Sequence, residues 1–239
     1  MPLSRLVPVK HSGKAKAAFR RMMIRALGIY WVLGLSLIAV NRFLVPGLLM
    51  PGVSGLTALL LGFALFAGYF FRDPDARVPE GEGLIVSPGH GTVDVIDETD
   101  EPAVMGGRCR RVSIFLSVFN VHVQQAPVTG VVTLVRHTAG QFLNALKLES
   151  AALNENVLIG FQTSEPACGP VAIKLITGLI ARRIVPWVQV GDSVSKGERV
   201  SLIQFGSRVD IYLPLGSRIT VALGDRVVGG ETVVARIGG

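Results

Sequence analysis

The sequence predicts a mainly β domain, a sandwich or open barrel with a few short helices, preceded by an α-helical membrane hairpin. Three observations lead to this fold class. Residues 26–71 contain one charged residue, Arg42. Residues 72–239 consist of short Val- and Ile-rich runs separated by Gly, Pro or Asp every 8–12 residues or so, the spacing typical of all-β domains. One ten-residue frame also occurs twice in this part of the chain.

The charged residues divide the chain into a basic N-terminal segment, residues 1–25, and a remainder with no net charge. Of the 239 residues, 49% are hydrophobic and 17% charged, whereas soluble domains carry about 25% charged residues. The net charge is +7, and seven of the 24 Lys and Arg residues lie within residues 1–25, which contain no acid. The remainder therefore has 17 basic and 17 acidic residues. A body without basic surplus argues against nucleic-acid binding.

The first two segments are predicted to be a basic cytoplasmic tail, 1–25, and a membrane hairpin, 26–71. The apolar stretch 52–71 is long enough to span the hydrocarbon core at about 1.5 Å per residue. The stretch 26–40 reaches spanning length only by continuing towards Val45. The alternative for 26–40 is a signal-peptide core or a half-inserted helix. Cleavage is disfavoured because no small-x-small site follows this stretch and because a second apolar segment comes after it.

Charge sets the expected topology of the hairpin. Basic residues precede the first helix, and Arg72 and Arg77 follow the second, whereas the turn carries only Arg42. The positive-inside rule then puts both ends in the cytoplasm, whether the two segments form a hairpin or a re-entrant pair, with the basic tail against anionic lipid headgroups. We therefore expect a cell-membrane protein whose working domain, residues 72–239, lies on the cytoplasmic face.

An internal repeat indicates a duplicated domain. GDSVSKGERV (191–200) and GDRVVGGETV (224–233) share the frame G-D-x-V-x-x-G-E-x-V, and SPGHGTV (87–93) and APVTGVV (126–132) form a weaker pair. Such paired hairpins resemble the lipoyl/biotinyl-type sandwich, which has two quasi-equivalent halves. Carriers of that type hold their cofactor on a tip lysine, and no Met-Lys or Asp-Lys tip occurs here. A short helix is also expected at 140–150.

Cysteine and histidine spacing gives no metal site. Cys109 and Cys168 are too few for a disulfide scaffold and do not form a CxxC motif. The four histidines show no HExxH or paired ligand spacing, so no structural zinc or other metal is expected.

The informative stretch is LIQFGSRVDIYLP (202–214), where Gly-Ser lies between two strand-like runs. Alone, such a pair is usually a turn or bulge. Together with SVFNVHVQQAPVTG (117–130) and ITGLIARRIV (176–185), it resembles the proenzyme of phosphatidylserine decarboxylase, the short membrane-anchored bacterial and archaeal type. The resemblance begins at FFRDPDARVP (70–79) and continues to the end of the chain.

The resemblance implies that the chain cuts itself between Gly206 and Ser207. A β chain, 1–206, and an α chain, 207–239, would result, with Ser207 converted to a pyruvoyl group. Decarboxylation leaves a carbanion, and a ketone that condenses with the substrate amine can accept its electrons. The implied activity is decarboxylation of phosphatidylserine to phosphatidylethanolamine and CO₂, without a separately bound cofactor.

The resemblance also assigns the acid–base residues. His122 takes the place of the family's histidine, which would deprotonate Ser207 and later remove its α-proton. The family has an Asp in a Ser-Pro-Ala-Asp-Gly turn, and the SPGHG sequence of this chain puts His90 there. A neutral imidazole can orient a histidine but cannot stabilise an imidazolium as a carboxylate does. Asp210, near Ser207, is the expected substitute carboxylate.

Substrate-binding residues are expected at four positions. Arg182 and Arg183 could contact phosphate, although a structural ion pair is an equal alternative. Phe115 and Phe119 are either core residues or the wall that receives the glycerol end of the lipid, as is Phe142. Two positions where the family has Arg differ, namely Gln125 and Asn156.

The expected partners are a phospholipid substrate, the membrane, and the α and β chains of one proenzyme, with a homodimer left open. One alternative is a diverged homologue that stays unprocessed or decarboxylates another aminophospholipid. His90, Gln125 and Asn156 favour that alternative. A second alternative, from another class, is a non-enzymatic membrane-tethered adaptor of the lipoyl-like type.

Overall fold

The computed structural model describes residues 5–6, 10–45, 47, 49–141, 143, 153–164, 169–178, 183–204 and 207–237. The chain divides into two compact units. The first contains residues 13–73, and the second contains residues 1–12 together with 74–239. Three sequence predictions lie outside the described residues, at Gly206, Arg182 and Phe142, and so does most of the helix expected at 140–150.

The smaller unit consists of two helices, α1 (Lys14–Phe43) and α2 (Leu49–Phe70). Both are long and apolar enough to cross a membrane by length and composition. They pack against each other: the side chain of Leu37 occupies the space where Gly52 lacks a Cβ, and the hydroxyl oxygens of Tyr30 and Thr57 lie 3.0 Å apart. Helix α1 begins at Lys14, well before the apolar stretch, so much of the basic tail is helical.

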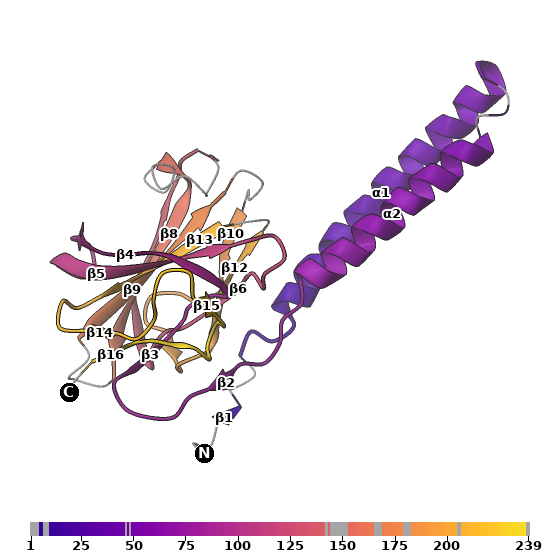
Figure 1. Cartoon of the computed structure of the whole chain (residues 1–239). Helices are drawn as coiled ribbons and strands as arrows, with labels where there is room; N and C mark the ends of the chain where they lie inside the picture. The colour runs from indigo at the N-terminus through magenta and orange to yellow at the C-terminus, as the bar shows by residue number, and fades with distance from the viewer. Residues whose placement is uncertain are drawn as a thin grey trace. The chain divides into compact units, whose positions relative to one another are not determined.

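The larger unit is built around an eight-stranded antiparallel sheet that curls over an apolar core (Figure 1). The strand order is β11-β7-β8-β9-β13-β5-β4-β15. The strands in this order are β11 (Ser193–Val194), β7 (Gly130–Thr138), β8 (Asn156–Thr163), β9 (Pro170–Thr177), β13 (Ser207–Leu213), β5 (Gly107–Leu116), β4 (Gly91–Glu101) and β15 (Arg226–Val227).

Two three-stranded sheets and a short ribbon complete the unit. The first sheet has the order β10-β12-β6 and the second the order β14-β16-β3. Their strands are β10 (Arg183–Pro186), β12 (Arg199–Gln204), β6 (Val123–Gln125), β14 (Arg218–Ile219), β16 (Val233–Arg236) and β3 (Leu84–Val86). The ribbon pairs β1 (Arg5–Leu6) with β2 (Arg77–Val78), so residues on either side of the helical unit pair with each other.

The eight-stranded sheet is pseudo-symmetric about its centre. Counting inwards from its two edges, β11 corresponds to β15, β7 to β4, β8 to β5 and β9 to β13. Irregularities in register agree with this matching. Strand β4 has a bulge between Val93 and Val95, and β7 has one between Val132 and Leu134. The β unit is therefore two equivalent halves: one contains β3, β4, β5 and β13–β16, and the other contains β6–β12.

The repeated frames occupy equivalent places in the two halves. Gly191 N donates to Val132 O, and Val132 N donates to Asp192 O. In the other half Gly224 N donates to Val93 O, and Val93 N to Asp225 O. The first glycine of each frame has a positive φ, 93° at Gly191 and 89° at Gly224, which requires glycine for its tight turn. The predicted mainly β fold preceded by two long apolar helices is confirmed, and both repeat pairs belong to its duplication.

Strand pairing shows which residue of the other half corresponds to each residue near Ser207. Val93 lies opposite Ile114 and Ile114 opposite Val209, whereas Val132 lies opposite Phe161 and Phe161 opposite Val171. Val209 of β13 thus corresponds to Val171 of β9. Counting back along these strands matches Arg208 with Pro170 and Ser207 with Gly169.

Candidate active site

Ser207 is the first residue of β13 and is fully buried. Its Cα lies opposite those of Leu116 in β5 and Thr177 in β9, so the strand is held on both sides from its first residue. Within the described part of the chain, the buried Oγ of Ser207 has no hydrogen-bond partner. A buried hydroxyl without a partner loses its hydration, and this cost calls for an explanation such as a chemical role.

His122 lies directly before β6 and is also fully buried. Ile203 N donates to His122 O at 3.1 Å, which puts His122 beside the end of β12. Only Phe205 and Gly206 separate that strand from Ser207. The Nδ1 atom lies 2.9 Å from Asn120 O. Because a carbonyl oxygen can only accept, this contact favours the tautomer with the proton on Nδ1, and Nε2 is then the basic nitrogen.

A tight turn between β5 and β6 positions this histidine. The N and Oγ atoms of Ser117 both donate to Asn120 Oδ1, at 2.9 and 2.8 Å, while Asn120 N donates to Ser117 O at 2.9 Å. Asn120 thus closes the turn with its side chain and holds the His122 ring with its carbonyl. Sequence reasoning missed Asn120, although an Asn three residues after a Ser is a recognisable turn signal. Phe119, at the same turn, is 64% exposed.

His90 lies in the turn before β4, which is fixed by a 2.6 Å hydrogen bond from Ser87 Oγ to Gly89 O. Its ring and the Gln125 side chain both lie against Gly229, where an added Cβ would collide with Gln125 Oε1 and come within 3.0 Å of His90 Cδ2. Gln125 is buried, and its Oε1 accepts no hydrogen bond from the described residues. Two positions that depart from the family pattern therefore lie together.

Other predicted residues lie at varied distances from Ser207. Arg183 begins β10 with its Cα opposite that of Gln204, so it belongs to the same end of the fold, and it is exposed. Asn156 is buried and donates from Nδ2 to Asn154 O at 2.9 Å. Asn154 itself, missed in the sequence, donates to Thr177 O at 2.8 Å and so fixes the strand end opposite Ser207.

Phe115 projects to the other face of the sheet from Ser207. Its Cα lies opposite that of Arg208, while Leu116 lies opposite Ser207. Residues directly opposite each other share a face, and neighbours along a strand alternate. Phe115 is half-buried beside the Arg208 row, and its assignment to a lipid-binding wall therefore remains a prediction without a contact to Ser207.

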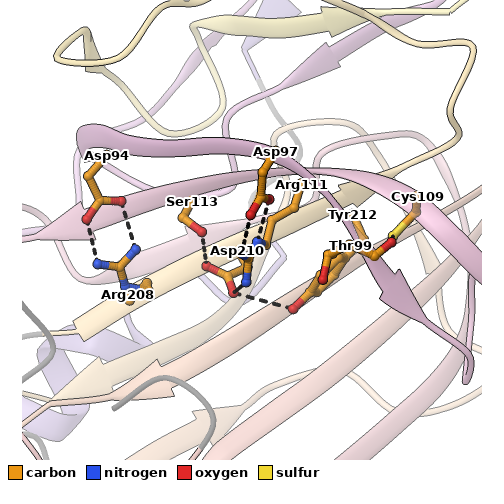
Figure 2. A network of polar contacts seen from close by, with 9 residues as sticks. All are labelled: Asp94, Asp97, Thr99, Cys109, Arg111, Ser113, Arg208, Asp210 and Tyr212. Atoms are coloured by element: carbon orange, nitrogen blue, oxygen red, sulfur yellow. Dashed lines mark hydrogen bonds and ion pairs between the residues drawn. The ribbon is translucent and has the colours of Figure 1, made fainter. Parts of the chain in front are cut away.

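The expected role of Asp210 is wrong for the same geometric reason. Arg208, Asp210 and Tyr212 point away from the core that contains Val209 and Ile211 (Figure 2). The carboxyl of Asp210 accepts a 2.5 Å hydrogen bond from Ser113 Oγ and a 3.3 Å one from Tyr212 Oη. Ser207 projects to the opposite face, so Asp210 contributes to a separate buried network and is not the carboxylate partner of His122.

Burial dominates the electrostatics of this network. It raises the pKa of Asp210 above its ordinary value, against the opposing effects of the Ser113 hydrogen bond and the Arg111 guanidinium. Burial also lowers the pKa of Lys174, whose Cα lies opposite that of Asp210. The pKa of the Cys109 thiol is raised to about 11 by burial, so this cysteine is unreactive at neutral pH.

No group of three or more His, Cys, Asp or Glu side chains among the described residues is placed to hold a metal ion. The candidate site therefore consists of the Ser207 hydroxyl at the head of an inner strand, the His122 ring held by a tight turn beside the preceding strand, and the paired side chains of His90 and Gln125 at Gly229.

Comparison with known proteins gives one consistent family. Residues 63–235 match the family model described as phosphatidylserine decarboxylase. The chain is 44% identical over 182 residues to the phosphatidylserine decarboxylase proenzyme of Symbiobacterium thermophilum, covering 76% of this chain and 84% of that protein. The proenzymes of Desulfotalea psychrophila, at 42% with the same coverage, and Zymomonas mobilis, at 46% over 71% of each chain, are similar.

These matches decide against the non-enzymatic adaptor, because the relatives are decarboxylase proenzymes over most of their length. The resemblance expected from the Gly-Ser, His122 and Arg-Arg motifs is confirmed over the same region. The chain is a decarboxylase that belongs to the phosphatidylserine decarboxylase family.

Proposed function

We propose that this chain cuts itself between Gly206 and Ser207, converts Ser207 to a pyruvoyl group, and decarboxylates phosphatidylserine to phosphatidylethanolamine. The observation that carries the proposal is the Ser207 hydroxyl, which is fully buried at the head of β13 and has no hydrogen-bond partner among the described residues. A hydroxyl in this position is held in place by the flanking strands β5 and β9 while its oxygen remains available for reaction.

The processing reaction balances with residues of this chain and one water molecule. Ser207 Oγ attacks the carbonyl carbon of Gly206 as its proton passes to a base, and the peptide bond becomes an ester with the Ser207 amine released. Removal of the Ser207 α-proton expels the Gly206 carboxylate and leaves dehydroalanine. Water then replaces the nitrogen, ammonia leaves, and a ketone remains. The base that fits both proton transfers is His122, with Nδ1 bound to Asn120 O and a basic Nε2.

A pyruvoyl group supplies a ketone that can take up the electron pair released when CO₂ leaves the substrate, which ordinary side chains cannot do. The residues present fit such a group because Ser207 is its only required precursor. Around it, β5 and β9 hold the strand, and His122 can deliver a proton to the product. Arg183, at the same end of the fold, could bind the phosphate of the headgroup.

Membrane attachment suits this reaction. The substrate is a lipid, and helices α1 and α2 are each long and apolar enough to span a bilayer. With basic residues before the first helix and after the second, we expect both ends of the hairpin and the catalytic domain on the cytoplasmic face. An anchored enzyme meets its substrate in two dimensions and need not extract it into water.

The turn at His90 favours a second candidate, a family member that stays unprocessed or acts on another aminophospholipid. The family's carboxylate is absent there, and His90 lies beside Gln125, where the family has a cation. If His90 only weakens the proton relay, His90→Asp should mature faster than the parent in a pulse–chase experiment. A slower variant would show that this chain uses His90 in its own way.

Intact mass of the protein purified from its membrane tests the main proposal. We expect two chains, 1–206 and 207–239, the second with a blocked terminus and lighter by one ammonia than its sequence predicts. Ser207→Ala should remain one chain. The matched control is Ser217→Ala, because Ser217 is also buried in the C-terminal segment with an unpartnered hydroxyl among the described residues. Cleavage of Ser207→Ala, or an intact parent, would refute self-processing at this bond.

A further inference from the structure

Arg208, the residue after Ser207, is anchored by a two-point ion pair. Its guanidinium donates to both carboxylate oxygens of Asp94, at 2.8 and 2.5 Å (Figure 2). The Arg208 side chain is 1% exposed, and Asp94 is one-third exposed. The pair extends from β13 across β5 to β4, because the Cα of Arg208 lies opposite Phe115 and that of Phe115 opposite Thr92. It joins three adjacent strands at the row next to Ser207.

A β-bulge sets the direction of the Asp94 side chain. It is the residue at which the register of β4 shifts between Val93 and Val95, and bulges commonly redirect a side chain. The other half has the same bulge at Thr133 in β7. There the residue equivalent to Arg208 is Pro170, which cannot form such a pair. The bulge thus belongs to the shared framework, but only the half that contains Ser207 uses it to place a carboxylate.

A cut before Ser207 creates a new chain end inside the sheet. The ends of strands open more easily than their interiors, and a cut removes the restraint of the preceding peptide. Ser207 cannot replace this restraint, because its side chain makes no hydrogen bond to the described residues. Arg208 is the first residue of the new chain with a side-chain anchor, and its backbone nitrogen carries the group derived from Ser207.

We propose that the Asp94–Arg208 ion pair is a positioning device, which holds the newly cut end of β13 so that the group derived from Ser207 stays fixed in the site. This inference rests on the proposed self-processing. Two-point binding of a guanidinium by a carboxylate fixes orientation as well as distance. The pair therefore matters more in the cut chain, where only the group derived from Ser207 precedes Arg208, than in the uncut chain.

The structure provides a matched control in Asp97 and Arg111. These residues form the same kind of two-point pair, at 2.9 and 2.6 Å, on the same face of the sheet, with Asp97 in β4 like Asp94 but Arg111 in the adjacent strand β5. Arg111 lies opposite Tyr212, four residues beyond Arg208 and away from the cut. Loss of either ion pair should lower the free energy of unfolding, but only loss of Asp94–Arg208 should loosen the cut end of β13.

The test compares Asp94→Asn with Asp97→Asn by hydrogen exchange and kinetics. In the mature protein, Asp94→Asn should speed exchange of the first amides of β13 by about tenfold and lower kcat by about tenfold, with KM within about twofold, since small misplacements cost rate and not uniform binding. Asp97→Asn should change neither quantity. In the uncut Ser207→Ala background, Asp94→Asn should raise exchange at β13 by less than about threefold.

Equal effects of the two substitutions in the mature protein would overturn the inference, as would equally fast exchange in cut and uncut chains. Because Asp94→Asn leaves a buried guanidinium without its counter-charge, it could unfold the protein. The double variant Asp94→Leu with Arg208→Met removes both charges and keeps an apolar contact. Retained kcat and slow exchange in that variant would also refute the inference. An intact wild-type chain would instead refute the self-processing on which it rests.

Discussion

In the half of the β unit made of β6–β12, strand β9 begins at Pro170, directly after Gly169. In the other half, the residues equivalent to Gly169 and Pro170 are Ser207 and Arg208, at the start of β13. His122 differs in the same way. Its carbonyl accepts from Ile203 N at 3.1 Å, and the equivalent acceptor in the other half is Gly83, bonded to Ile237 N at 2.9 Å. Both proposed reactive residues thus stand where the duplicate has glycine.

The shared features are those of the framework. Equivalent bulges, equivalent Gly-Asp turns and equivalent strand orders occur in both halves. The differences are side chains attached to that framework: Ser207, His122 and the Asp94–Arg208 pair. The comparison teaches that the two halves share one curled-sheet framework, and that the residues proposed to act lie at the start of β13, at the bulge of β4 and at the turn that precedes β6.

The largest expected effect is that of His122→Ala. If His122 is the base that the framework positions, its loss should block self-cleavage or slow it by about a hundredfold or more, the usual share of a general base. Pulse–chase labelling measures the rate of processing. The control is His137→Ala, since His137 is exposed and pairs with Glu155 at 3.0 Å. Normal maturation of His122→Ala would remove this residue from the mechanism and weaken the functional contrast between the halves.

The next largest effects are expected for Gly91→Ala and Gly130→Ala. These glycines are the first residues of β4 and β7 and occupy equivalent positions in the two halves. A Cβ at Gly91 would collide with Phe115 O, and one at Gly130 with Gln162 O. Each backbone must move, so each variant should lose about 1–3 kcal/mol of unfolding free energy, the usual cost of overpacking. Urea unfolding measures both. A large effect in only one variant would contradict a common framework.

The smallest predicted effect concerns the pH dependence of stability. Burial raises the pKa of Asp210 in the folded protein, so ionisation is easier in the unfolded chain and stability falls as the pH rises through the folded pKa. Asp210→Asn lacks this loss. The unfolding free energy of the variant should therefore rise relative to the parent as the pH increases above about 4, the ordinary pKa of an aspartate. A pH-independent difference in unfolding free energy between variant and parent would contradict a raised pKa of Asp210.

Much of this architecture can be predicted from the sequence, because the repeat frames contain glycine and aspartate residues whose turns are specified locally. The long apolar helices follow from composition alone. The bulges do not, since a shift of register depends on the neighbouring strand and leaves no local signal. Asn154 was missed because its bonds to Leu143 and Thr177 join segments that only the fold brings together. Asn120 bonds within its own turn, and there a local turn signal was overlooked.

The error at Asp210 has a simple physical origin. Asp210 lies three positions after Ser207, an odd number, and side chains of a strand alternate between faces. Proximity in sequence suggested a partner for His122, whereas alternation puts the two side chains on opposite sides of the sheet. The same alternation explains why Phe115 and Leu116, adjacent in sequence, face Arg208 and Ser207 respectively.

If the chain cuts itself as proposed, the position of β13 between β5 and β9 has a consequence for refolding. The intact chain can fold in a unimolecular reaction, whereas a protein cut at Ser207 must recover an inner strand of its largest sheet from a separate polypeptide. Its refolding would depend on concentration, and its effective stability would be kinetic. Maturation would then commit each molecule to a single folding event, and unfolded mature protein would be replaced by synthesis and not repaired.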